Sequence, residues 1–198
     1  MLAAKPSGQT SAFTLIEILV VITIIIVLMA LLFPVFRGAQ DQAKKAQAKN
    51  DLTQIVTAVN AFYTEYGRYP VLSTIGANGT YDATNNDQLF NVLRGTANAG
   101  EQLGLNPRQI AFITPPVAKD PNAPRSGIGQ SNGKYYDPWG TPYQVRLDVN
   151  YSNWVQTNPP YTNAPTWNGV NAGVLAWSFG KDGKLGANGG GRCDSERI

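Results

Sequence analysis

One carboxylate stands alone inside a long apolar segment near the start of the chain. Between residues 13 and 36, Glu17 is the only ionisable side chain. An unpaired charge in hydrocarbon costs on the order of a few kcal/mol, so a carboxylate at such a position is a functional-site hypothesis by default. The chemistry that Glu17 offers is neutralisation of an opposite charge. The alternative is that Glu17 sits at the level of lipid headgroups and reaches into water.

The rest of the chain offers few groups for catalysis or for metal binding. It contains no histidine, which removes the commonest general base and the commonest metal-binding imidazole. Cys193 is the single cysteine, so neither an intrachain disulfide nor a thiolate metal site can form. The net charge of +3 comes from scattered basic residues, which argues against a nucleic-acid partner. The sequence therefore predicts that the chain is not an enzyme.

The element that carries Glu17 is predicted to be a membrane-spanning helix over residues 13–36. About 20 consecutive apolar residues cross the hydrocarbon core as a helix, and this segment is long enough. Two interpretations of the N-terminus remain open. The segment is either an uncleaved signal anchor, or a leader of residues 1–12 is removed between Ala12 and Phe13 and the helix is kept.

A second, amphipathic helical half is expected over residues 37–70. Apolar side chains recur at intervals of three and four residues as far as Tyr66, while charged residues such as Lys44 and Asp51 occupy other faces. Gly67 is a helix stop, and Pro70 prevents the helix from resuming. Pro34 lacks an amide donor and is expected to kink the helix. The apolar stripe is expected to pack against a globular domain.

Residues 71–198 are predicted to form that globular domain. A short helix is expected over residues 87–94, a short extended or helical piece over residues 110–113, and turn chemistry over residues 137–142. Two strands are expected at residues 143–147 and 174–179, which indicates an antiparallel sheet laid on the long helix. The predicted fold class is α+β.

The stretch Ala12-Phe13-Thr14-Leu15-Ile16-Glu17, followed by the apolar segment, resembles the processing motif of the type IV pilin superfamily. The resemblance implies that a prepilin peptidase cuts between Ala12 and Phe13 and that the new Phe13 amine is methylated. The family usually has glycine before the cut, where this chain has Ala12. The resemblance also implies that Glu17 neutralises the Phe13 amine of a neighbouring subunit, and that Glu17 and Pro34 act in assembly.

Three further stretches resemble the major pseudopilins of type II secretion: residues 58–70, 137–143 and 177–183. In that family the segment opened by residues 177–183 is a calcium loop. Asp182, with Asn188 and Asp194 as further oxygen donors, is therefore a candidate Ca²⁺ site. A turn without metal is the alternative, because this chain has glycines where the family has further aspartates.

The resemblance predicts a structural subunit of a type II secretion pseudopilus in the bacterial inner membrane, single-pass, with a periplasmic C-terminal domain. Counting basic residues after the apolar segment would instead place that domain in the cytosol, and the resemblance decides against this. The implied partners are other copies, other pseudopilins, prepilin peptidase, the membrane proteins of the secretion platform and inner-membrane lipid. The alternatives are a type IV pilus or competence pilus subunit, and a membrane-tethered binding module with an aromatic loop containing Trp154, Tyr161 and Trp167.

Overall fold

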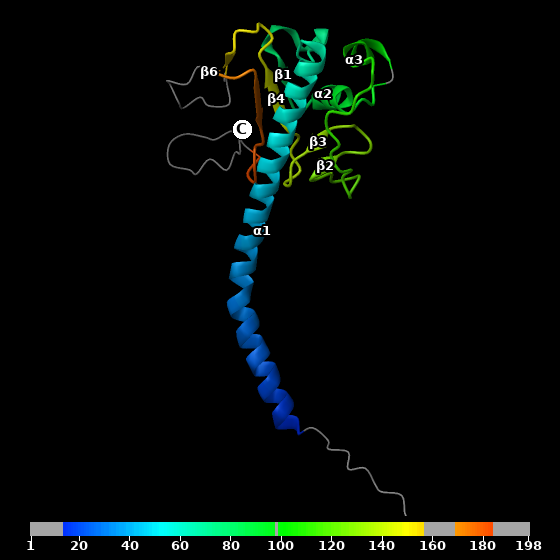
Figure 1. The fold of residues 1–198 in the computed structure, drawn as a ribbon. Coiled ribbons are helices and arrows are strands. Elements are labelled where there is room, and N and C mark those ends of the chain that lie inside the picture. The colour runs from blue at the N-terminus through cyan, green and yellow to red at the C-terminus, as the bar shows by residue number, and fades with distance from the viewer. Residues whose placement is uncertain (1–13, 98, 157–168, 184–198) are drawn as a thin grey trace, which may run out of the picture. The chain divides into compact units, whose positions relative to one another are not determined.

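The computed structural model describes residues 14–97, 99–156 and 169–183, without the side chains of residues 32–37, 77 and 78 (Figure 1). The chain divides into two compact units, Met1–Gln42 and Ala43–Ile198. Helix α1, Leu15–Tyr66, contributes residues to both. Each unit is taken by itself below, and the predicted division into residues 1–12, 13–36, 37–70 and 71–198 stays a prediction.

Helix α1 ends where the sequence predicts. Gly67 has a left-handed φ of 66°, which glycine adopts without steric cost, and its N–H donates to the carbonyl of Tyr63 at 2.8 Å. The helix continues through position 34, so Pro34 does not end it. Pro34 itself is among the residues whose side chains are not described.

The membrane-spanning part of the prediction is not confirmed. No helix among the described residues is long and apolar enough to cross a membrane.

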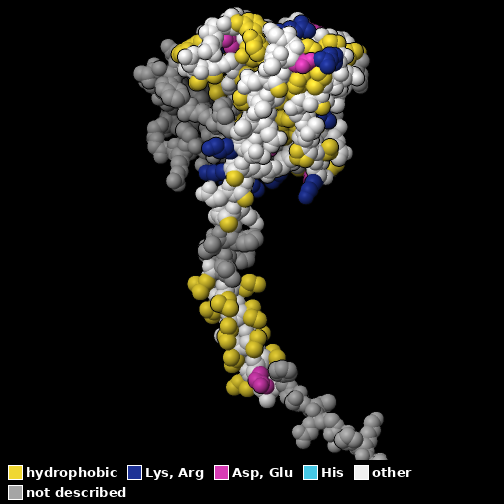
Figure 2. All heavy atoms as spheres, viewed as in Figure 1, with side chains coloured by type: hydrophobic (Ala, Val, Ile, Leu, Met, Phe, Trp, Pro, Cys, Tyr) yellow, Lys and Arg dark blue, Asp and Glu magenta, His cyan; other side chains and the backbone are white. Residues whose placement is uncertain are grey.

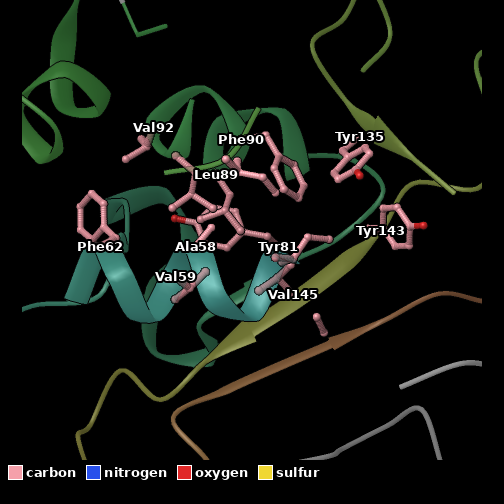
Figure 3. Packing of buried hydrophobic residues seen from close by; sticks show 14 of the residues in the cluster. Ala58, Val59, Phe62, Tyr81, Leu89, Phe90, Val92, Tyr135, Tyr143 and Val145 are labelled. Carbon is pink, nitrogen blue, oxygen red and sulfur yellow. The ribbon is translucent and has the colours of Figure 1, made fainter. Parts of the chain in front are cut away.

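The core of the C-terminal unit forms around the second half of α1. Leu52, Ile55, Val59 and Phe62 recur every three or four residues, so they share one face of the helix, and each is fully buried. Figure 3 shows Val59 and Phe62 in one cluster with side chains from helix α2, Asn86–Leu93. The predicted packing of the amphipathic half against the globular domain is therefore confirmed.

The main sheet has three antiparallel strands in the order β1-β4-β7: Thr80–Tyr81, Gln144–Leu147 and Val174–Trp177. Val145 at the centre pairs with Tyr81 on one side and Ala176 on the other, and all three are fully buried. The two predicted strands and the predicted short helix are confirmed, each within two residues at its ends. The α+β class is confirmed.

The remaining elements are short, and the sequence did not predict them. They are the 3₁₀ helix η1, Ser73–Asn78, helix α3, Gly100–Leu105, the pair β2–β3, Gly127–Ile128 and Tyr135–Tyr136, and the pair β5–β6, Val155–Gln156 and Gly169–Val170. Residues 110–113 form no helix or strand, although the N–H of Phe112 donates to the carbonyl of Leu93 at 2.8 Å.

Candidate functional site

Glu17 closes a capping box at the start of α1. Its carboxylate accepts hydrogen bonds from the N–H of Thr14 at 2.9 Å and from the Thr14 hydroxyl at 2.8 Å. The Glu17 N–H in turn approaches the Thr14 hydroxyl oxygen at 3.4 Å. The pattern Thr-x-x-Glu satisfies backbone donors that the first helical turn leaves without partners. The carboxylate is therefore held at the very start of the helix.

Apolar side chains surround Glu17 on every face of the helix. Leu15 is 83 % exposed and Leu31 is 69 % exposed. Every large apolar side chain between these two residues is at least 48 % exposed. Figure 2 shows these hydrophobic side chains covering the N-terminal part of α1. The hydroxyl of Thr23 donates to the carbonyl of Leu19 at 2.7 Å, so even this polar group is satisfied within the helix. A helix that is apolar all round must be buried by something else.

Only part of the predicted processing and assembly site can be placed. Glu17 lies at the start of α1, and Pro34 lies within the same helix. Ala12 and Phe13 lie outside the described residues, so the predicted cleavage stays a prediction. Sequence reasoning missed the role of Thr14, although the Thr-x-x-Glu spacing was available as a signal.

The predicted Ca²⁺ site is likewise only partly placed. Asp182 lies in the turn that follows β7, whereas Asn188 and Asp194 lie outside the described residues. Within the described ranges, no three acidic, cysteine or histidine residues are grouped so that they could hold a metal ion. The calcium site stays a prediction.

The predicted turn over residues 137–142, called the Asp137 turn here, is built around a buried carboxylate. One oxygen of Asp137 accepts the backbone N–H groups of Trp139, Gly140 and Thr141 at 2.8–2.9 Å. The other oxygen accepts the hydroxyl of Ser178, which follows β7. Burial raises the pKa of Asp137, and these hydrogen bonds oppose that rise. The turn is thereby fixed to the end of the sheet.

Two tyrosines flank the Asp137 turn, and both are anchored from other elements. The side-chain amide of Asn86 on α2 donates to the carbonyls of Tyr135 at 3.1 Å and of Tyr143 at 2.9 Å. The hydroxyl of Tyr143 donates to Asp51 on α1 at 2.8 Å. Asp51 is 7 % exposed, which corrects the expectation that it lies on a polar face of the helix. Tyr143 is 92 residues away from Asp51 in sequence, so local periodicity could not reveal this contact.

The chain is similar to known subunits of type IV pili and of type II secretion systems. It is 35 % identical over 69 residues to the type IV major pilin protein PilA of Myxococcus xanthus, a match that covers 35 % of this chain and 31 % of that protein. It is 42 % identical over 62 residues to the type II secretion system core protein G of Pseudomonas aeruginosa, covering 31 % of this chain and 44 % of the relative. The core protein G of Aeromonas hydrophila is 27 % identical over 137 residues, covering 69 % of this chain and 73 % of the relative.

These relatives confirm the resemblance to the type IV pilin superfamily, close to the type II secretion pseudopilins. They are structural subunits rather than enzymes, which agrees with the prediction that this chain is not an enzyme. The chain spans less than half the length of the first two relatives that it matches. No family model matches the chain, and no solved structure matches it.

Proposed function

We propose that the chain is a structural subunit of a type II secretion pseudopilus and polymerises through the N-terminal part of α1. The observation that carries the proposal is the apolar surface on every face of that helix, interrupted by one capped carboxylate. Such a surface is removed from water when like helices pack side by side, and burial of apolar area favours this by about 25 cal/mol per Å².

Glu17 supplies the register of this assembly in the proposal. Cleavage between Ala12 and Phe13 would create an amine one residue before Thr14. The capping box holds the carboxylate against the backbone N–H of Thr14, where a neighbour's amine could meet it. Pairing two charges in an apolar surrounding must first overcome their desolvation, so the pair contributes more to register than to net stability.

The proposal also gives the chain partners and a location. Prepilin peptidase would remove residues 1–12 and methylate Phe13, after which copies of the chain and other pseudopilins would join the filament. Before assembly, the apolar segment would be accommodated in the bacterial inner membrane, with the C-terminal unit in the periplasm beside the secretion platform. The support for these steps is the match to core protein G in two organisms.

A second candidate is a subunit of a type IV pilus. The match to a major pilin over 69 residues favours it, and the same apolar helix would serve in that filament. The two candidates differ in what is lost when the gene is deleted. Loss of protein export supports the pseudopilus, whereas intact export with loss of surface pili supports the pilus.

The experiment for both candidates is mass spectrometry of the chain recovered from sheared filaments. The proposal predicts a chain that begins at a methylated Phe13. A chain that keeps Met1, or a filament fraction that lacks the chain, would overturn the processing and assembly proposal.

A further inference from the structure

A buried carboxylate joins α1 to the Asp137 turn. Tyr135 comes just before the turn and Tyr143 just after it, and the hydroxyl of Tyr143 donates a hydrogen bond to Asp51 at 2.8 Å. The two tyrosine rings meet edge to face with their centroids 4.9 Å apart, and Figure 3 shows them side by side at one end of the core cluster. The carboxylate therefore holds the arm that carries Tyr143 directly, and the arm that carries Tyr135 through the contact between the two rings.

The surroundings of this carboxylate contain a like charge. Tyr143, Tyr135 and the carboxylate of Asp137 lie close enough to Asp51 to shift its pKa. On α1, the exposed Lys49 is two residues before Asp51 and therefore on another face, and Lys44 is seven residues before it, about 10 Å along the helix axis. Arg125, which is exposed, packs against Gly140 of the turn. The phenol hydroxyl of Tyr143 therefore donates to an ionised Asp51 beside a second buried carboxylate, that of Asp137.

Proton binding at this cluster is linked to folding. Burial raises the pKa of Asp51 above its ordinary value, the tyrosine hydroxyls oppose that rise, and the charge of Asp137 adds to it. The folded protein thus binds a proton more tightly than the unfolded chain does. The stability that this proton provides is fully present at a pH below the ordinary pKa of an aspartate in the unfolded chain. It is lost as the pH rises through the raised pKa of Asp51 in the folded protein.

We propose that Asp51, Tyr135 and Tyr143 form a proton-linked latch that holds the Asp137 turn on α1 more firmly when Asp51 is protonated. Protonation removes a desolvated charge and its repulsion with Asp137, and the new O–H can donate a hydrogen bond within the cluster. Ionisation of Asp51 keeps the hydrogen bond from Tyr143 but restores the repulsion with Asp137. The latch is a property of the C-terminal unit and stands apart from the proposed role in a filament.

The test is hydrogen exchange of the full-length chain in detergent micelles, followed by mass spectrometry of peptides that cover residues 135–143. Exchange is measured from pH 8 to pH 4.5 and corrected for the intrinsic pH dependence of exchange. The wild-type peptides should gain protection several-fold as the pH falls. Asp51→Asn keeps the size of the side chain but cannot ionise, so its protection should vary far less with pH and exceed the wild-type value at pH 8.

Two further variants separate the latch from a merely structural contact. Tyr143→Phe removes one donor to the ionised carboxylate, so protection should begin to rise at a higher pH than in the wild type. Asp120→Asn, at an exposed acid in a loop, should follow the wild-type profile. The proposal would be overturned if protection from exchange varied with pH in the same way in the wild type, Asp51→Asn and Tyr143→Phe. If Asp51→Asn fails to fold, the comparison of Tyr143→Phe with the wild type still decides the question.

Discussion

Replacing Asn86 by aspartate puts a carboxyl group where the fold needs two donors. Asn86 is fully buried, and its amide hydrogens go to the carbonyls of Tyr135 and Tyr143. An ionised carboxylate there would face two carbonyl oxygens with no donor, so the group must take up a proton in the folded state. The protonated acid can donate one hydrogen bond, which leaves one of the two carbonyls without this partner.

The cost of Asn86→Asp follows from two contributions. Keeping an acid with an ordinary pKa of about 3.9 protonated at pH 7 costs about 4 kcal/mol, at 1.36 kcal/mol per pH unit. The lost hydrogen bond adds about 1 kcal/mol. The variant should therefore lose about 5 kcal/mol at pH 7 but only about 1 kcal/mol at pH 4. The sign follows from linkage, because a raised pKa in the folded state gives stability that is lost as the pH rises.

The assay is urea unfolding of the full-length chain in detergent, followed by the near-ultraviolet circular dichroism of its tyrosines and tryptophans. A domain of this size is stable by roughly 5–15 kcal/mol, so the loss at pH 7 lowers the urea midpoint severely and acid restores it. Asn86→Leu, which cannot titrate, is the matched control and should show the same loss at both pH values. A loss for Asn86→Asp that is below about 1 kcal/mol at pH 7, or independent of pH, would refute the reasoning.

Two substitutions test the packing of the C-terminal unit. Gly79→Ala should lower stability by about 1–3 kcal/mol, because φ is 58° and an added Cβ would collide with the carbonyl oxygen of Leu147. Gly104→Ala is the control and should be neutral or slightly stabilising, because an added Cβ there would meet nothing within 4 Å. Phe62→Ala should cost about 3–5 kcal/mol, since the ring is fully buried between α1 and the rest of the core. Thr64→Ala on the exposed face should stay within about 0.5 kcal/mol of the wild type. Thermal unfolding measures the stability of all four variants. If a variant and its control lost the same stability, the packing described for that site would be contradicted.

The sequence predicted those features that depend on neighbours in the chain. The end of α1 at Gly67 and the Asp137 turn were both found, because glycine, proline and aspartate act on the backbone within a few residues. The burial of Asp51 was not predicted, because it depends on contacts with residues far along the chain, such as Tyr143, which is 92 residues away.

The short elements escaped prediction for a related reason. Strands β2, β3, β5 and β6 have two residues each, too few for alternation of apolar and polar side chains to be recognised. Helix α3 begins at Gly100, a residue that is unfavourable in helices, and is held by its surroundings. Asn86 likewise carried no local sign that it would bridge two carbonyls.

Filament formation by Glu17 variants tests the central claim most directly, because it separates the charge of Glu17 from its capping role. Glutamine serves in a capping box as glutamate does, so Glu17→Gln should keep the start of α1 intact while removing the charge that would neutralise the Phe13 amine. Thr14→Val removes the capping hydroxyl and keeps the charge. The account predicts that sheared fractions contain filaments of the wild type and of Thr14→Val but none of Glu17→Gln. Filaments of Glu17→Gln in wild-type amount would contradict it.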